Sequence, residues 1–358
     1  MAWTSQPEIA LLRDLVATPS VSGSEESIAR RVEEWARAAG LGVHRDDASV
    51  TVTVPGNSPG DTLAFVSHLD TVPAGQGWTR PAFEATIEAD RMFGRGSGDA
   101  KASVAAMLVA ARDVAEAGGP PKGRLLVVLG YEEETKLTTM GTAVERLGMI
   151  DAAVVGEPTN LEFAVAQRGL MMVDLVARGD QRHAGYAADT ADFTNAIVEL
   201  GRNLARLPSL FRNRVHPVLG LATATPTMLE SGISRNVTPP LARAVLDVRS
   251  TPSWTHTELA EVLRSELDVE VDVTSDRLVP CETPAGSRLL KAAQSVRPEG
   301  AAFGSPTCSD WVFLRDRDAI KCGPGTSRRS HTPDEYVDLP EVAAARHFYR
   351  QLAQAYLA

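Results

Sequence analysis

Apolar and polar positions alternate along the chain up to Gly156 in two rhythms, one helical and one extended. Residues 24–39 carry apolar side chains at helical spacing among charged ones, which predicts a surface helix. Three short β-branched runs, each followed by polar residues, are typical of strands buried on both faces; they lie at 62–70, 124–131 and 152–157. Between the first two, an Ala-rich stretch from Lys101 to Gly118 predicts a buried crossover helix. This order indicates an α/β fold with a mixed, mostly parallel sheet flanked by helices.

The pattern changes at about Gly169, where the order becomes strand, helix, strand, strand, helix, strand. This order predicts a compact α+β insertion. After about Pro284 short helical and strand patterns return, and the chain ends in a helix predicted from Pro340 to Leu357. We therefore expect a first domain formed by residues 1–168 and 283–358, with an inserted domain over 169–282.

The composition limits the possible partners. A chain of 358 residues with 44% apolar side chains can bury the cores of two domains. Its net charge of -10 offers no basic field for nucleic acid or an anionic membrane, so a small molecule is the expected partner. No signal-peptide pattern and no run of about 18 apolar residues is present, which favours a cytoplasmic protein. The three cysteines show no CxxC spacing and are expected to be buried thiols.

Candidate catalytic side chains follow the predicted strands. His68 and Asp70 end the first buried strand, Asp99 follows a glycine-rich turn, and residues 132–134 and Glu157 follow the next two strands. In open α/β sheets the binding crevice lies outside the carboxyl ends of the strands, so these side chains should converge. Imidazole and carboxylate groups suit zinc, and a carboxylate can bridge two ions about 3.5–4 Å apart. The spacing of His68 and Asp70 puts both on one face of a strand, where Asp70 can accept a hydrogen bond from the ring.

Other catalytic motifs do not explain these residues. The turn FGRGSGD is rich in glycine but is not the GxGxxG of a dinucleotide site. The chain contains neither the GxSxG of serine hydrolases nor the GxxxxGK[ST] of nucleotide hydrolases.

The same segments carry a resemblance to a known family. In order and separation they resemble the metal motifs of the M20 family of metallopeptidases and deacylases; the motifs are SHLDTVP, GRGSGDAK, EEE, GEPT and SHTPDEY. The resemblance covers nearly the whole chain. It implies a zinc-exopeptidase-like catalytic domain, an inserted lid and dimerisation domain, and a homodimer formed through that lid.

The resemblance also implies a role for each matching residue. Asp99 would bridge two zinc ions, with cobalt or manganese as other possible metals. His68 and Glu157 would bind one ion, and Glu134 and His331 the other. Glu133 would be the general base, and Asp70 would orient the site.

The register of the three glutamates is open, because the family usually has Asp-Glu-Glu at this place. If Glu132 takes the Asp position, Glu133 is the base and Glu134 the ligand. If Tyr131 takes it, both roles move back by one residue. The separation from Asp99 favours the first register.

Further candidates lie in or next to the inserted domain. His183 matches a histidine that reaches across a dimer toward the oxyanion, although the sequence here is HAG rather than HSS or HAS. Asn236 and Arg249 match residues that hold the substrate carboxylate, a task suited to the guanidinium fork. Arg168, at the entry to the insertion, is a further candidate for contacting substrate.

Together these features predict a metal-dependent hydrolase that removes the acyl group from a small N-acyl amino acid. An N-acetylornithine or N-acetylcitrulline deacetylase of amino-acid biosynthesis is the preferred interpretation. The alternatives are a succinyl-diaminopimelate desuccinylase, a hydrolase releasing lysine or ornithine from a carrier protein, and an M20 carboxypeptidase or aminoacylase. A protein that binds metal and ligand without catalysis is the alternative outside the enzymes.

Overall fold

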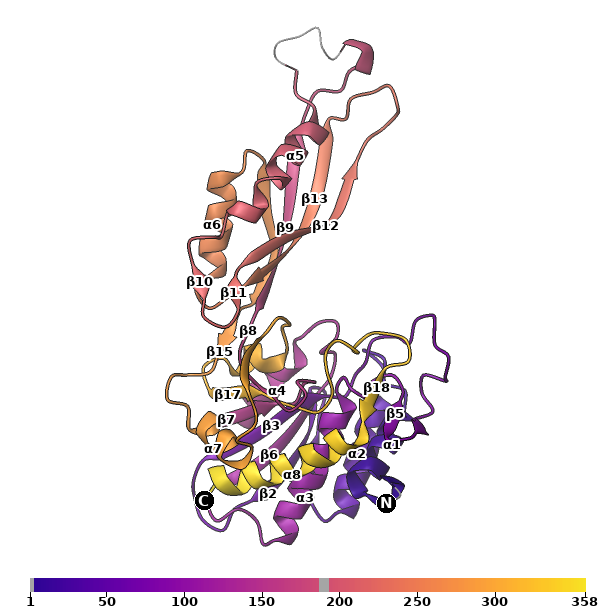
Figure 1. Ribbon diagram of the computed structural model, residues 1–358, viewed down its shortest axis with the longest axis vertical. Helices are drawn as coiled ribbons and strands as arrows, with labels where there is room; N and C mark the ends of the chain where they lie inside the picture. Colours follow the sequence, from indigo (N-terminus) through magenta and orange to yellow (C-terminus); the bar gives the residue numbers. More distant parts are fainter. Residues whose placement is uncertain (1–2, 187–192) are drawn as a thin grey trace. The chain divides into compact units, whose positions relative to one another are not determined.

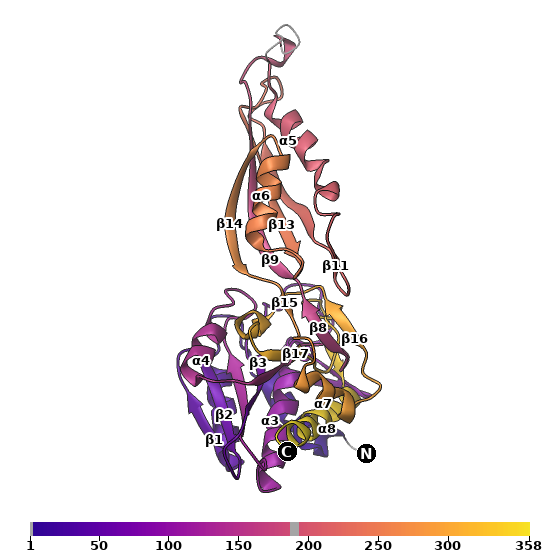
Figure 2. The same cartoon turned by 90° about the vertical axis from the view of Figure 1, so that its left-hand side faces the viewer.

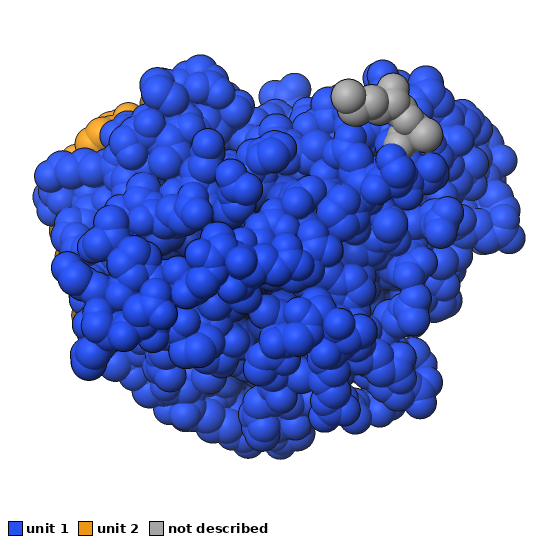
Figure 3. Space-filling model, turned by 90° about the horizontal axis from the view of Figure 1, so that it is seen from below, with its two compact units in different colours: residues 1–165, 283–303, 309–358 blue, residues 166–282, 304–308 orange. Residues whose placement is uncertain are grey.

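The computed structural model describes residues 3–186 and 193–358, which form two compact units. The first unit contains residues 1–165, 283–303 and 309–358, and the second contains residues 166–282 and 304–308 (Figure 3). Segment 304–308 belongs to the second unit through backbone pairing, since the Arg168 N–H donates to the Ser305 carbonyl at 3.1 Å. In the described residues, no helix is long and apolar enough to cross a membrane.

A mixed sheet forms the centre of the first unit (Figure 1), although its last strand β15 and the end of β8 consist of residues of the second unit. Its order is β1-β2-β6-β3-β7-β17-β8-β15, with β16 beside β8. Strands β6, β3, β7 and β17 are parallel, whereas β1 and β2 are antiparallel to their neighbours. The strands are β1 (Gly42–Arg45), β2 (Ser49–Pro55), β3 (Thr62–His68), β6 (Arg124–Gly130), β7 (Ala152–Val155), β8 (Phe163–Gln167), β15 (Cys281–Glu282), β16 (Ala302–Ser305) and β17 (Asp318–Lys321).

Helices cover the sheet because its strands are apolar on both faces. Leu63 and Phe65 of β3 belong to one core with α1, α2, α3, α7 and α8, and the Phe65 ring lies 5.1 Å from that of Tyr349. Helix α3 packs against α8 (Figure 1) and is buried along most of its length, as expected for a crossover helix. The helices are α1 (Pro7–Val16), α2 (Glu26–Ala38), α3 (Lys101–Glu116), α4 (Thr139–Leu147), α7 (Arg288–Val296) and α8 (Leu339–Tyr356), with short 3-10 helices η1 (Trp3–Ser5) and η4 (Asp310–Leu314). A small sheet of β4 (Thr86–Glu88), β5 (Arg91–Phe93) and β18 (Tyr336–Asp338) completes the unit.

The second unit is a four-stranded antiparallel sheet in the order β12-β13-β9-β14, with α5 and α6 packed on it (Figure 2). Alternate residues of β9 and β13 form the core with these helices, for example Val173 and Leu246. Its elements are β9 (Gly169–Arg178), η2 (Ala184–Tyr186), α5 (Ala196–Leu204), η3 (Leu207–Ser209), β10 (Val215–His216), β11 (Gly220–Leu221), β12 (Thr223–Ser231), β13 (Leu241–Ser250), α6 (His256–Glu266) and β14 (Glu270–Leu278). The α/β class with a mostly parallel sheet, predicted from the hydrophobic pattern, is thus confirmed.

Candidate metal centre

The residues expected at a metal site lie at the ends of three neighbouring strands and on two loops. His68 ends β3, Glu134 follows β6, and Glu157 follows β7. These strands are parallel and adjacent in the order β6-β3-β7, so their carboxyl ends meet at one edge of the sheet. Asp99 lies just before α3, and the peptide bond that follows it is cis. His331 lies in the loop before β18.

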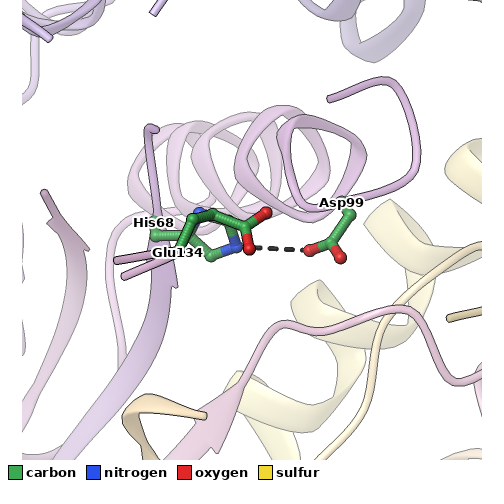
Figure 4. A group of neighbouring side chains, drawn as sticks. All are labelled: His68, Asp99 and Glu134. Atoms are coloured by element: carbon green, nitrogen blue, oxygen red, sulfur yellow. Dashed lines mark hydrogen bonds and ion pairs between the residues drawn. The ribbon is translucent and has the colours of Figure 1, made fainter. Parts of the chain in front are cut away.

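Five side chains converge at this edge. His68 Nε2 lies 3.3 Å from an Asp99 carboxylate oxygen and 3.7 Å from one of Glu157. On the other side, His331 Nε2 lies 3.0 Å from Glu134 and 3.8 Å from the second Asp99 oxygen. His68, Asp99 and Glu134 each offer a ligand atom, and these three atoms lie within 4.8 Å of one another (Figure 4). Asp99 therefore lies between two pairs of ligands, one on each of its oxygens.

Asp70 contacts His68 and the backbone of Glu133 and Glu134. Its carboxylate lies 3.3 Å from His68 Nδ1 and accepts hydrogen bonds from Ser22 Oγ at 2.6 Å and from the Glu133 and Glu134 N–H groups at 3.0 Å. The Asp70 carbonyl is also 3.1 Å from His68 Nδ1. Since both neighbours of Nδ1 are acceptors, Nδ1 carries the proton in the neutral ring, which leaves Nε2 free to bind a cation. Asp70 thus orients a histidine and the Glu133–Glu134 loop at once.

The electrostatics of the site favour a bound cation. Burial, and next the charge of Asp99, raises the pKa of Glu157 to about 8, and burial also raises the pKa of Glu134. Although burial acts to lower the pKa of His68, hydrogen bonds to Asp70 and Asp99 outweigh it and raise this pKa well above its usual value. Several carboxylates therefore share a buried site, and the pKa of Glu157 stays raised although the charges of His68 and Lys321 oppose the rise. Divalent cations would supply further positive charge, and carboxylate and imidazole donors fit zinc, cobalt or manganese.

The three consecutive glutamates point in different directions. The Glu132 carboxylate accepts from exposed Lys136 at 2.7 Å. Glu134 contacts His331, as described above. Glu133 is buried, and its pKa is raised well above the usual value by burial, with the carboxylate of Glu157 adding to the effect. These contacts favour the register in which Glu134 is a ligand and Glu133 the base.

Two of the substrate-binding candidates, Arg168 and Arg249, belong to the second unit and contact residues of that unit. Arg168 donates to the backbone carbonyls of Leu219, Leu221 and Arg249, and Arg249 pairs with Asp247 at 2.7 Å. Substrate contact by either arginine stays a prediction.

Two further candidates lie close to each other in the second unit. His183 is exposed, its Nδ1 accepts from the Gly185 N–H at 3.1 Å, and it forms a β-bridge with Val237. Asn236 accepts a hydrogen bond from the Ala184 N–H through its backbone carbonyl at 2.8 Å. Whether His183 and Asn236 contact substrate stays a prediction as well.

Two buried acids near the centre were missed by the sequence reasoning. Asp310, at the start of η4, is 3% exposed, and burial raises its pKa to about 7; His68 opposes this rise and Asp70 adds to it. Glu335 is 1% exposed and bonds to the loop that carries Asp99. In both cases an acid directly precedes an aromatic residue and an apolar stretch, as DWVFL and EYV, which was the available signal.

The chain is similar to known proteins over most of its length. The sequence profile of "Peptidase family M20/M25/M40" matches residues 64–355. Acetylornithine deacetylase of Myxococcus xanthus is 31% identical, with 85% of each chain covered. Succinyl-diaminopimelate desuccinylase of Cereibacter sphaeroides is 28% identical and covers 98% of this chain and 99% of its own. The Bacillus subtilis YXEP protein, described as a dinuclear metal binding peptidase, superposes with a TM-score of 0.74 over 97% of this chain and 96% of its own at 16% identity. That last similarity shows a shared fold.

Proposed function

Because this chain belongs to peptidase family M20/M25/M40, whose members hydrolyse amides, we propose that it removes the acyl group from a small N-acyl amino acid. The observation that carries the proposal is the convergence of two histidines and two glutamates around Asp99. The predicted membership of the family is confirmed, and with it the hydrolase class.

Two divalent ions are the proposed cofactors. His68 and Glu157 would hold one, Glu134 and His331 the other, and Asp99 would contact both. Ions bound there would lower the pKa of a bound water and stabilise the negative charge that develops on the amide oxygen. The contacts of His68 and His331 with opposite oxygens of Asp99 support this division. The dinuclear peptidase of the same fold is consistent with it.

Glu133 is the proposed general base and acid. It takes a proton from the attacking water, whose oxygen forms the new bond to the acyl carbon. It then passes that proton to the nitrogen as the C–N bond breaks, so one carboxylate serves both transfers. A raised pKa suits this double role because the group must release the proton as readily as it accepts it. Asp70 keeps the Glu133 backbone in place through its N–H.

The second unit would supply substrate contacts. We assign Asn236 and Arg249 to binding the substrate carboxylate. Arg168, at the entry to this unit, is a further residue assigned to substrate contact, and His183 would reach the oxyanion across a dimer. A guanidinium suits a carboxylate because its planar fork can donate two parallel hydrogen bonds.

A homodimer through the second unit is part of the proposal. Strand β12 is an edge strand whose residues are mostly exposed, and Met228 and Leu229 on it are 56% and 59% exposed. An exposed apolar edge strand is a template for pairing with another chain. A second copy, paired edge to edge, would cover it.

The substrate class rests on the relatives. Acetylornithine deacetylase and succinyl-diaminopimelate desuccinylase both release an amine from an acyl group, and neither is similar enough to this chain to decide between them. We prefer N-acetylornithine or N-acetylcitrulline, and keep the succinyl substrate as the alternative. Hydrolysis of an aminoacyl carrier-protein conjugate or a short peptide follows in rank. A cytoplasmic location belongs to the same proposal.

The proposal is tested by initial rates on N-acetyl, N-succinyl and peptide substrates, measured after chelation and again after zinc, cobalt or manganese is added back. Activity that disappears with the chelator and returns with metal is expected, with the highest kcat/KM on an N-acetyl amino acid. A preference for the succinyl substrate would replace the acetyl assignment. Metal binding without turnover of any substrate would favour a non-catalytic binding protein.

A further inference from the structure

Glu335 is a buried carboxylate that is surrounded by hydrogen-bond donors. Its Oε1 accepts from the backbone N–H groups of Gly98 and Asp99, at 3.0 and 3.1 Å. Its Oε2 accepts from Arg95 Nη1 at 2.5 Å and from the Gly96 N–H at 3.2 Å. Burial raises the pKa of this carboxyl, but every one of these groups needs an acceptor, so the carboxylate is the form that the loop holds.

The backbone of Glu335 is bound to the same loop. Its carbonyl accepts from the Gly94 N–H at 2.9 Å and from Ser97 Oγ at 3.4 Å. Residues 94–99 therefore wrap around one residue of a segment that is more than two hundred positions away in the sequence. Arg95 is itself anchored, because it donates to the Ala74 carbonyl at 3.2 Å and lies over the Trp78 ring at 5.2 Å.

The two segments joined in this way carry two of the metal ligands. Asp99 ends the loop 94–99, and His331 lies four residues before Glu335. His331 has a φ of 64°, a left-handed conformation that a side chain other than glycine adopts only when its surroundings hold it. The Glu335 carbonyl and the pairing of β5 with β18 also join these segments. The Glu335 carboxylate is the group that accepts from the N–H of Asp99 itself, so it bears on the distance between Asp99 and His331.

The two halves of the proposed centre depend on this link unequally. His68 and Glu157 are placed by the ends of β3 and β7, which the central sheet holds. Glu134 is placed by the hydrogen bond from its N–H to Asp70. Asp99 is shared by both halves, whereas His331 belongs to one half alone. The Glu134/His331 half thus has two ligands, Asp99 and His331, on the segments that Glu335 joins. The His68/Glu157 half has one, Asp99.

We propose that Glu335 is a positioning residue that couples the two halves of the metal centre, and that the Glu134/His331 half depends on it more strongly than the His68/Glu157 half. This inference rests on the proposed two-ion centre. Loss of a partner that orients a metal ligand lowers metal affinity by about 10–100-fold. We expect a loss of that size at the His331 half and a change of less than about threefold at the other.

The test uses the full chain, freed of metal by chelation and titrated with Co²⁺ by calorimetry and by visible absorption. Glu335→Gln keeps the shape of the side chain but replaces one carboxylate oxygen, which accepts hydrogen bonds, by an NH₂ group, which donates them and would face N–H groups. Two Co²⁺ ions are expected per wild-type chain, and in Glu335→Gln the second should bind at least tenfold more weakly. His331→Ala and His68→Ala serve as spectroscopic references, and the spectrum of Glu335→Gln with one equivalent should match that of His331→Ala.

Glu8→Gln is the matched control. Glu8 is as buried as Glu335 and is paired with a guanidinium, that of Arg346 at 2.9 Å, on helices α1 and α8. This control should leave both Co²⁺ affinities unchanged, even if its melting temperature falls. If Glu335→Gln does not fold, Arg95→Gln removes the ion pair while leaving the bonds to Gly98 and Asp99, and it should also weaken the second ion.

The outcomes separate the two proposals. A wild-type chain that binds no Co²⁺ overturns the metal centre and this inference with it. A wild-type chain with two ions and a folded Glu335→Gln with equal affinities overturns the coupling role alone. The coupling role is also overturned if both Co²⁺ affinities fall equally in Glu335→Gln, or if Glu8→Gln shows the same loss of affinity. It is overturned as well if Arg95→Gln leaves both affinities unchanged.

Discussion

Replacing Glu133 by glutamine separates the role of proton transfer from those of metal binding and folding. The amide has the shape of the carboxylate but cannot take a proton from water. General acid–base catalysis contributes about 10²–10⁴-fold to rates, so kcat should fall by that factor, which corresponds to about 2.7–5.5 kcal/mol in the barrier. The backbone N–H of Glu133 donates to the Asp70 carboxylate, and this bond does not involve the substituted side chain.

The stability of the metal-free chain should not fall along with the rate. Burial and the carboxylates of Glu157 and Asp310 raise the pKa of Glu133, so its charge is unfavourable in the folded protein. A neutral amide removes that repulsion, and the metal-free variant should melt no lower than the wild type. Rate, metal content and melting temperature are measured on the same preparations.

Glu132→Gln is the matched control, since the Glu132 carboxylate forms an ion pair with exposed Lys136. Its kcat should stay close to that of the wild type, because an exposed ion pair contributes little. The reverse result would refute the reasoning. If Glu132→Gln lost the rate while Glu133→Gln lost metal, the roles of both residues would move back by one position.

Three further predictions concern other parts of the molecule. Asp70→Asn places a donor against buried N–H groups, so the free energy of unfolding, measured with urea, should fall by about 1–3 kcal/mol. Co²⁺ should bind about 10–100-fold more weakly, and unchanged values would contradict the orienting role. Burial lowers the pKa of His256, so the folded state prefers the neutral ring. The neutral ring therefore stabilises the fold above about pH 6.5, and this stabilisation is lost as the pH falls below that value. His256→Asn should flatten this pH dependence of urea unfolding, and an equally steep dependence would count against it. Leu229→Lys should convert a dimer into a monomer in light scattering, whereas a wild-type monomer at all concentrations would remove the proposed interface.

Much of the fold was predictable because it depends on local pattern. The buried run at 62–70 became β3 at Thr62–His68, and the Ala-rich stretch from Lys101 became α3 at Lys101–Glu116. Period and burial are encoded in consecutive residues, so they can be read from the chain alone. The antiparallel pairing of β1 and β2 was not predicted, because periodicity does not specify which strands become neighbours or in which direction they run.

The candidate ligands were also predictable, for a different reason. His68, Glu134 and Glu157 follow strands, and the geometry of parallel sheets brings the ends of such strands together. The register of the glutamates was not settled by spacing. It depends on which side chain turns toward His331 and which toward Lys136, and the path of the backbone after β6 decides that.

The sequence by itself determined which residue types are available, where strands and helices form, and which family the motifs resemble. Only the tertiary structure decided how distant segments meet. Glu335 carried no more signal than any acid before an aromatic residue, because its proposed role arises from the N–H groups of Gly96, Gly98 and Asp99, which fold around it. A hydrogen bond depends on distance and direction in space, and these are fixed by packing rather than by position along the chain.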